Sequence, residues 1–365
     1  MRLMARLIMA SALLCAGVAV ARATPPADRL AVLRHGVNLT NWFRFPARAD
    51  DDALRSYLSD AAMTALHRAG FGFVRLAVQP ELLEAAPQRL ALLVQAVSRL
   101  QRHGLAVVVA AHPATWHLEA SAADRGRLLA FWQRVAPALR PLDPRLTYPE
   151  ILNEPVFAEA PAAWEALQRA ALAEIRTALP DATVVLTGAD WGSVDGLTAL
   201  HPLADRNVIY SFHFYEPPEL TALASYRPGL DRAALARLPF PMNETGCHVA
   251  QQGSDSADTR ALITFVCGLH WDVARIDARF ARAADWGQEN HAAVLLGEFG
   301  ATRRLNTSAR LAWLTAVRQA CEQRGIGWAL WGYDDSMGFG IDPRAAPTPA
   351  PDIATLTALG LGAGE

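Results

Sequence analysis

The sequence predicts an α/β protein built as a single closed (β/α)8 barrel, the TIM-barrel architecture. Three observations lead to this prediction. Eight short apolar segments recur along the chain, as expected of parallel strands that are buried on both faces. Amphipathic segments with apolar residues at three-and-four spacing lie between most of them. Polar and aromatic residues follow directly after the apolar segments, where the loops of such a barrel form one rim.

The eight predicted strands are short apolar runs bounded by turn-forming or polar residues. They cover residues 33–39, 71–78, 105–111, 146–152, 183–187, 207–212, 292–298 and 326–331. An open doubly wound sheet is the alternative arrangement. That fold more often carries a glycine-rich phosphate-binding turn after its first strand, and residues 36–39 (Gly-Val-Asn-Leu) do not form one.

Helices are predicted between the strands wherever the apolar spacing is helical. They cover residues 51–69, 88–103, 124–140, 162–179 and 308–324, and Gly70, Gly104 and Gly325 provide stop signals. Residues 216–257 instead contain five prolines and no clear period, so a long, partly ordered excursion over the rim is expected after the sixth strand. A Pro-rich tail then leads to one last short helix.

The composition indicates a large hydrophobic core and excludes several classes of function. Of the 365 residues, 52% are hydrophobic, and the net charge of −2 with a pI near 6.6 argues against a nucleic-acid-binding protein. All 34 basic residues are Arg, which indicates a GC-rich bacterial source. The lack of Lys excludes a Schiff-base lysine and a Walker-type phosphate-binding lysine.

The first 23 residues have the pattern of a secretory signal peptide: Arg2 and Arg6, an apolar run over 7–20, and Ala-Arg-Ala at 21–23. A lipoprotein signal at Cys15 is the less favoured alternative. Residues 24–365 are then expected to form one catalytic domain, secreted or periplasmic and monomeric. No later run is apolar for long enough to span a membrane. Of the three remaining cysteines, Cys247 and Cys267 have a plausible spacing for a disulfide.

Two glutamates stand where predicted strands end. Glu154 follows an apolar strand and precedes Pro155, which forces the chain to turn, and Glu298 closes another apolar strand between Gly297 and Gly300. A lone Glu is usually a solvated loop residue, but two in the same strand-end context indicate a carboxylate pair in one cleft. Proximity to the apolar interior is expected to raise the pKa of Glu154 and to keep a proton on it.

The other strand ends complete a recognisable constellation. It comprises Asn38, Arg75, His112, Asn153 with Glu154, His213 with Tyr215, Glu298 and Trp331. This constellation resembles glycoside hydrolase family 5, the cellulase-type retaining β-glycosidases on an eightfold barrel. The resemblance covers nearly all of residues 30–345. Its most specific motifs are Asn-Glu-Pro at 153–155 and Gly-Glu-Phe-Gly at 297–300, supported by His-Phe-Tyr at 213–215 and Trp-Gly-Tyr-Asp-Asp at 331–335.

The resemblance implies a role for each of these residues. Glu154 becomes the general acid/base and Glu298 the nucleophile, with Arg75 holding Glu298 ionised and Tyr215 orienting it. Asn153 contacts the 2-hydroxyl of the sugar, and the remaining residues line the substrate site: Asn38, His112, His213 and Trp331. His112, His117 and His213 lack the spacing of a helix-borne zinc motif, so neither metal nor cofactor is expected.

The predicted function is therefore hydrolysis of a β-linked polysaccharide, most simply by an endo-β-1,4-glucanase. A β-mannanase, a xyloglucanase or an exo-β-glucanase of the same family is the alternative within the class, and a non-catalytic glycan-binding barrel is the alternative from another class. The sequence departs from the family pattern at Ala110, where an acid often stands two residues before the histidine, and in the long excursion over 216–257. Both departures bear on the substrate and not on the carboxylate pair.

Overall fold

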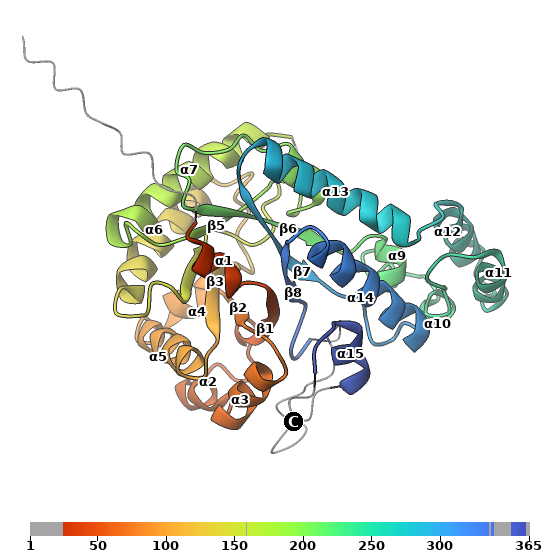
Figure 1. Ribbon diagram of the computed structural model, residues 1–365, viewed down its shortest axis with the longest axis horizontal. Coiled ribbons are helices and arrows are strands. Elements are labelled where there is room, and N and C mark those ends of the chain that lie inside the picture. Colours follow the sequence, from red (N-terminus) through yellow and green to blue (C-terminus); the bar gives the residue numbers. More distant parts are fainter. Residues whose placement is uncertain (1–24, 158, 336, 339–351, 363–365) are drawn as a thin grey trace, which may run out of the picture.

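Eight parallel strands close into a barrel in the order in which they occur along the chain (Figure 1). The computed structural model describes residues 25–157, 159–335, 337–338 and 352–362. The strands are β1 (His35–Phe43), β2 (Phe73–Val78), β3 (Ala106–Ala111), β4 (Thr147–Glu150), β5 (Val184–Thr187), β6 (Val208–Phe214), β7 (Ala293–Phe299) and β8 (Gly327–Leu330). Because β1 also pairs with β8, the sheet has no edge, and the predicted (β/α)8 barrel is confirmed.

The inside of the barrel consists of an apolar layer with a polar layer above it. Phe73, Val108, Tyr148 and Leu295 belong to the buried apolar cluster that fills the lower part. Side chains alternate along a strand with a period of two, so the residues two positions further on face inward as well. On β2 and β4 these residues are charged, and they lie toward the carboxyl ends of the strands, where barrel enzymes place their sites.

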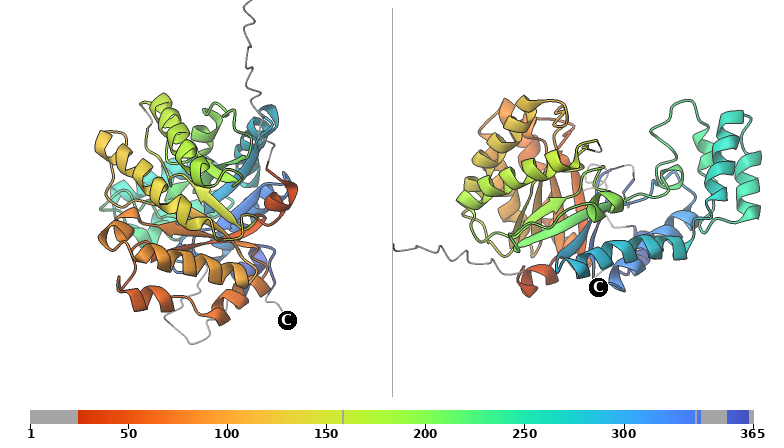
Figure 2. Two further views of the ribbon diagram at one scale, coloured as in Figure 1. Left: turned by 90° about the vertical axis from the view of Figure 1, so that its left-hand side faces the viewer. Right: turned by 90° about the horizontal axis from the view of Figure 1, so that it is seen from above.

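Helices surround the barrel and bury their apolar faces against the outer faces of the strands (Figure 2). The long ones are α5 (Arg89–Arg102), α6 (Ala122–Leu139), α7 (Pro161–Ala178), α13 (Val273–Glu289) and α14 (Thr307–Glu322). Shorter ones are α4 (Pro80–Ala85), α8 (Val194–Thr198) and α15 (Ile353–Ala358), whereas α1 (Ala27–Ala31), which precedes β1, has no buried residue. The predicted stop at Gly104 is confirmed, since its φ of 80° is one that glycine adopts without strain.

The single helix predicted over 51–69 is two helices, α2 (Asp51–Ser56) and α3 (Asp60–Arg68). The break lies at Ser59, whose side chain accepts a hydrogen bond from the backbone N–H of Ala62 and starts a new helix. The apolar spacing runs through both helices because both pack against the same core. Spacing alone therefore hid the capping residue between them.

The excursion expected after the sixth strand is present, and it is more helical than the partly ordered segment predicted over 216–257. It contains α9 (Pro218–Thr221), α10 (Arg232–Leu235), α11 (Glu244–Gln252) and α12 (Ala257–Gly268). We call residues 216–272 the arm; α11 and α12 stand at its far end, away from the barrel (Figure 2). Asn243 and Ser256 cap the two outer helices, so proline separates helices here and does not exclude them.

The arm is held together by a disulfide and attached to the rim by backbone contacts. Cys247 and Cys267 are bonded, as their spacing indicated, and the remaining described cysteine, Cys321, is buried. The N–H of Thr302, in the loop after β7, donates to the carbonyl of Thr221 at 2.8 Å. The arm therefore starts at the same rim as the loops that follow the other strands.

The predicted signal peptide over 1–23 lies outside the described residues. Within the described residues, no helix combines the length and the apolar content needed to cross a membrane.

Candidate active site

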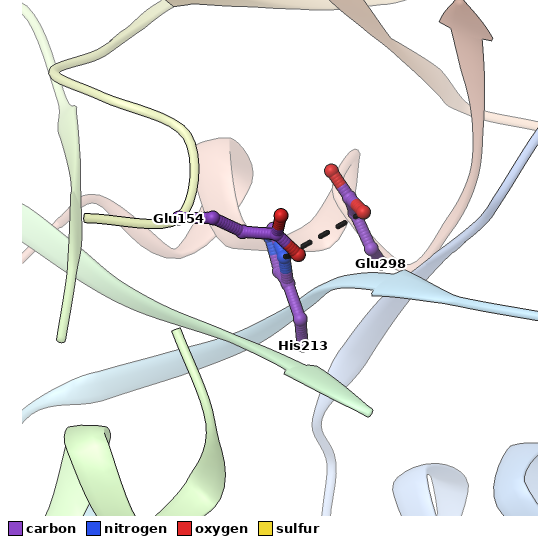
Figure 3. Close-up of side chains that lie close together, drawn as sticks. All are labelled: Glu154, His213 and Glu298. Carbon is purple, nitrogen blue, oxygen red and sulfur yellow. Dashed lines mark hydrogen bonds and ion pairs between the residues drawn. The ribbon is translucent and has the colours of Figure 1, made fainter. Parts of the chain in front are cut away.

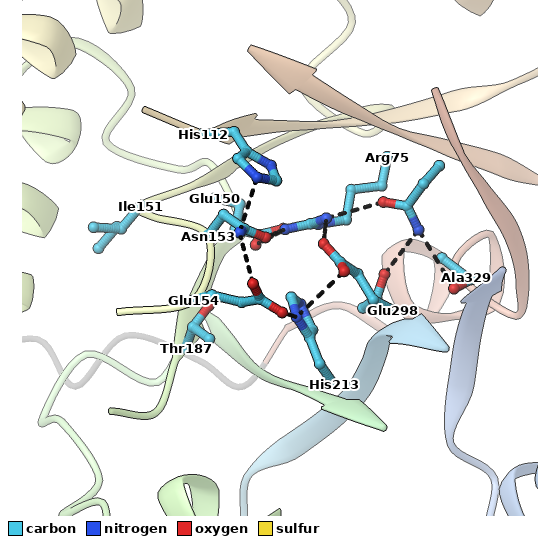
Figure 4. A network of polar contacts seen from close by, with 12 residues as sticks. Arg75, His112, Glu150, Ile151, Asn153, Glu154, Thr187, His213, Glu298 and Ala329 are labelled. Atoms are coloured by element: carbon cyan, nitrogen blue, oxygen red, sulfur yellow. Dashed lines mark hydrogen bonds and ion pairs between the residues drawn. The ribbon is translucent and has the colours of Figure 1, made fainter. Parts of the chain in front are cut away.

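All nine residues predicted from the strand ends lie at the carboxyl-terminal rim of the barrel, and Figure 4 shows most of them in one polar network. Asn38 and Arg75 lie within β1 and β2, His112 directly after β3, Asn153 and Glu154 after β4, His213 within β6 with Tyr215 just beyond it, Glu298 within β7, and Trp331 directly after β8. The barrel thus brings together residues from seven of its eight strands.

Strand β4 ends at Glu150, earlier than the predicted boundary at residue 152. The segment beyond it still bonds to both neighbouring strands: the N–H of Ile151 donates to Val185 at 3.1 Å, and that of Asn153 donates to Ala111 at 2.8 Å. Glu154 then takes a φ of 42°, a left-handed conformation that is uncommon for a residue with a side chain. Such an outlier at a rim position is typical of functional sites.

The two glutamates face each other across the mouth of the barrel, with His213 beside both (Figure 3). One carboxylate oxygen of Glu154, one of Glu298 and a ring nitrogen of His213 lie within 4.8 Å of one another. Retaining glycosidases hold their two carboxyl groups about 5–5.5 Å apart, whereas inverting enzymes need about 6.5–9.5 Å to admit a water molecule. This pair has the closer spacing.

Arg75 is the centre of the network, and its guanidinium uses all five of its N–H donors. Nε and Nη2 donate to the two oxygens of Glu150 at 2.7 and 2.6 Å. Nη1 donates to Glu298 at 2.5 Å and to the side-chain oxygen of Asn38 at 2.9 Å. Nη2 also donates to the side-chain oxygen of Asn153 at 2.9 Å. A fully buried charge needs such complete pairing.

Glu150 is the member of this network that the sequence analysis missed. Its side chain is fully buried and forms a two-pronged ion pair with Arg75. Its neighbour across the parallel ladder is Ala110, the position at which the family often carries an acid. Glu150 thus supplies a buried carboxylate beside that position, from the adjacent strand β4. The alternation of side chains along the strand could have identified Glu150 from the sequence, because it places Glu150 on the same inward face as Tyr148.

Tyr215 and His213 contact the carboxylates from β6. The hydroxyl of Tyr215 donates to Glu298 at 2.9 Å, and burial raises the pKa of Tyr215 well above its usual value, so it remains a donor. Nδ1 of His213 lies 3.0 Å from Glu154 and 3.6 Å from Glu298. Burial lowers the pKa of His213, but the charge of Glu298 and the hydrogen bond to Glu154 outweigh burial, so the net change is upward.

The pKa values of the pair in the free site run opposite to the expectation from the sequence. Burial raises the pKa of Glu154, but the hydrogen bond and charge of His213 outweigh it, and the net change is downward. Burial raises the pKa of Glu298, and the negative charge of Glu154 raises it further. The positive charges of His213 and Arg75 lower it, but the net change is upward. His213 lowers the pKa of both carboxyl groups, by its hydrogen bond and charge at Glu154 and by its charge at Glu298.

His112 and Asn153 form a second contact in the same layer. Nε2 of His112 lies 3.1 Å from the side-chain nitrogen of Asn153, which places the amide toward the mouth. Burial, together with the positive charge of Arg44, lowers the pKa of His112 well below its usual value, so the ring is neutral. The neutral ring of His112 can accept a hydrogen bond from the side-chain N–H of Asn153. The side-chain oxygen of Asn153 accepts from Arg75 at the same time.

Aromatic side chains border the mouth. A cavity of about 380 Å³ adjoins Glu154 and is lined on its other sides by Arg44, Trp116 and Trp191, among others. Trp191 is 59% exposed, which is unusual for so large an apolar ring. The guanidinium of Arg44 lies 5.6 Å from the ring centre of Trp331. Exposed rings beside hydrogen-bonding groups suit the flat, hydroxyl-rimmed faces of sugars.

Glu154, His213 and Glu298 are also spaced closely enough to hold a metal ion. Their atoms are already in use, however, because Glu154 bonds with His213 and both oxygens of Glu298 accept from other residues. A cation at this point would in addition face the guanidinium of Arg75 at 2.5 Å from Glu298. The arrangement favours a carboxylate pair over a metal centre.

Comparison with known proteins decides the family. A model of the cellulase family, glycosyl hydrolase family 5, matches residues 34–336, which is most of the chain. The chain belongs to glycosyl hydrolase family 5. The predicted family is thereby confirmed, on the same part of the sequence that carried the resemblance.

Curated relatives of this family 5 protein are endoglucanases. Endoglucanase 3 of Fibrobacter succinogenes is 29% identical over 192 residues, which cover 50% of this chain and 29% of that protein. Endoglucanase C of Acetivibrio thermocellus is 20% identical over 322 residues, covering 84% of this chain and 92% of that protein. The family 5 chain thus spans less than a third of the Fibrobacter protein, but nearly all of the Acetivibrio one.

Solved structures share the fold over almost the whole chain. The endoglucanase Cel5A of Thermotoga maritima superposes with a TM-score of 0.74 at 22% identity, covering 92% of this chain and all of that one. A xyloglucanase of Bacteroides ovatus gives a TM-score of 0.68 at 17% identity, covering 91% of this chain and 75% of that one. At these sequence identities the similarity shows a shared fold.

Proposed function

We propose that this protein is a retaining β-glycosidase that cleaves a β-linked polysaccharide within the chain, as an endo-β-1,4-glucanase. The observation that carries the proposal is the carboxylate pair at the ends of β4 and β7, with oxygens within 4.8 Å of each other. Family membership and the endoglucanase relatives support the same reaction class. A glycan-binding barrel without activity would not need two carboxylates held this close together.

In the proposed mechanism Glu298 attacks the anomeric carbon while Glu154 protonates the leaving oxygen. The C–O bond to the leaving sugar breaks as the bond to Glu298 forms, which yields a covalent glycosyl ester. Glu154 then takes a proton from a water molecule that attacks the ester, and Glu298 leaves as a carboxylate. Arg75 and Tyr215 donate to Glu298 and orient it. In the proposed complex the Asn153 amide donates to the sugar 2-hydroxyl.

Product stereochemistry tests the mechanism directly. Proton NMR during the first minutes of hydrolysis of a β-1,4-linked oligosaccharide should show the β-anomer before mutarotation. A parallel screen over β-glucans, mannans, xyloglucans and xylans gives the preferred backbone, and loss of viscosity ahead of reducing-end release shows cleavage within the chain. The α-anomer as first product would refute the retaining mechanism, and no release from any substrate would favour a binding protein.

Replacing His213 by Gln should move the pH–rate profile toward higher pH. His213 lowers the pKa of Glu154 through its hydrogen bond and that of Glu298 through its charge. Without it both pKa values rise, so both limbs of the kcat/KM profile should shift upward, by about one pH unit. His201→Gln is a matched control, because His201 pairs with Glu165 at the surface. Unmoved limbs would mean that His213 does not control the pKa values of the two glutamates.

We further propose export to the periplasm or the medium, on the signal-peptide pattern of residues 1–23 and on the Cys247–Cys267 disulfide, a bond typical of oxidising compartments. The intact mass of protein recovered from the producing cells should correspond to a chain that begins at Thr24. A full-length chain retained in the cytoplasm would contradict export.

A further inference from the structure

We propose that Glu150 is a positioning residue for hydrolysis: it divides the charge of Arg75 between two carboxylates and thereby keeps Glu298 a competent nucleophile. This inference rests on the proposed function and concerns a residue that does not touch the reacting sugar in that mechanism. Its starting point is the ion pair buried directly beneath the candidate active site (Figure 4).

The geometry singles out Glu150 as the strongest partner of Arg75. Both of its oxygens accept from the guanidinium, at 2.6 and 2.7 Å, and both side chains are fully buried. Glu298 receives only one of the five N–H donors, at 2.5 Å. Glu150 binds the edge of the planar guanidinium formed by Nε and Nη2. The remaining nitrogen, Nη1, therefore points toward β1 and β7, where it donates to Asn38 and Glu298. The direction in which Arg75 presents its charge to Glu298 is therefore set from β4.

The charges lead to the same conclusion. Arg75 carries one positive charge and faces two carboxylates, so Glu150 offsets much of the attraction that Glu298 would otherwise feel. A carboxylate that attacks an anomeric carbon loses negative charge as the ester forms. Overstabilising its ionised form therefore raises the barrier, because only interactions that are stronger in the transition state speed the step. With Glu150 neutral, Arg75 would hold Glu298 too tightly.

Several other charged or titratable groups face Glu298 and must be considered with Glu150. They are Arg44 after β1, Arg75 on β2, Glu154 after β4, and His213 and Tyr215 from β6. Among the described residues, Arg75 is the one member of this set whose side chain bonds to Glu150. A change at Glu150 therefore reaches Glu298 through Arg75 and through the field of the lost charge.

The test is Glu150→Gln, which keeps the shape and removes the charge. Without the negative charge Glu298 should ionise more readily, so the acid limb of kcat/KM should move to lower pH by about one unit. At the optimum, kcat should fall about tenfold or more while KM changes little, because the lost effect belongs to the chemical step. A residue with only a structural role would change the melting temperature and leave the acid limb in place.

Two further variants serve as controls. Asp205→Asn removes the carboxylate of another Arg ion pair, the 2.6 Å contact with Arg176 outside the site, and should lower thermal stability without moving the acid limb. Ala110→Asp combined with Glu150→Gln restores a carboxylate at the register partner on β3, and should return the acid limb to its wild-type position. The double variant also serves if Glu150→Gln alone does not fold.

Failure of the positioning role can be distinguished from failure of the proposed function. A folded Glu150→Gln variant with wild-type kcat, or with reduced kcat and an unmoved acid limb, would overturn the positioning role. So would a double variant whose limb stays displaced from the wild-type position. If the wild-type protein releases no sugar from any β-glycan, the proposed function fails first, whatever the variants do.

Discussion

Glu298→Gln is expected to reduce kcat on a β-1,4-glucan by roughly 10⁴-fold or more, because the covalent path is lost and no water fits between the carboxyl group and the sugar. The variant should remain folded, since the amide oxygen can still accept from Arg75 or Tyr215. Circular dichroism and a melting curve establish folding, and reducing-end release measures the rate. A rate within tenfold of wild type would remove Glu298 from the mechanism.

Glu298→Ala extends this test to the identity of the attacking group. The smaller side chain leaves space for azide, which would attack the anomeric carbon from the face that Glu298 occupies. The product should then be an α-glycosyl azide, with configuration opposite to that of the substrate. Recovery of a β-glycosyl azide would place the nucleophile elsewhere.

Glu154→Gln is expected to lower kcat on polysaccharide by about 10²–10⁴-fold, the usual contribution of general acid/base catalysis. The loss should depend on the leaving group. An aryl glycoside with an acidic phenol needs little protonation, so its first step should stay fast. The ester on Glu298 should then accumulate, because no base remains to activate water. Glu154 is thus distinguished from Glu298 by chemistry as well as by rate.

Mass spectrometry of the stalled Glu154→Gln protein provides the direct measurement. The protein should gain the mass of one glycosyl unit, and peptide mapping should place it on the peptide that contains Glu298. A matched control is Glu165→Gln, which removes a surface carboxylate that pairs with His201 and should leave turnover unchanged. Equal losses of Glu154→Gln on aryl glycosides and on polysaccharide would contradict the role of Glu154 as general acid.

The sequence alone determined the fold and most of the candidate site. Parallel strands buried on both faces must be nearly continuous apolar runs, and eight such runs with helices between them allow few arrangements other than a closed barrel. Since all eight carboxyl ends meet at one rim, any polar residue at a strand end could be assigned to that rim. Residues as distant along the chain as Asn38 and Glu298 could therefore be grouped before any contact was known.

The sequence also contained signals that spacing alone left ambiguous. Ser59 divides what looks like one helix, and Asn243 and Ser256 begin helices in a stretch that its prolines made appear irregular. In each case a single capping side chain decides the local conformation, whereas the apolar spacing reports only which face is buried.

The pairing of the charges became apparent only once the barrel was described. Glu150 is an ordinary residue of a short strand until the barrel closes and places both of its oxygens against Arg75. The pKa of Glu154 was expected to rise by burial, yet the approach of His213, from a different strand, reverses the direction. Burial can be inferred from a local pattern of apolar residues. The sign and strength of an electrostatic interaction depend on distances of a few ångströms between segments far apart in the chain, which folding alone establishes.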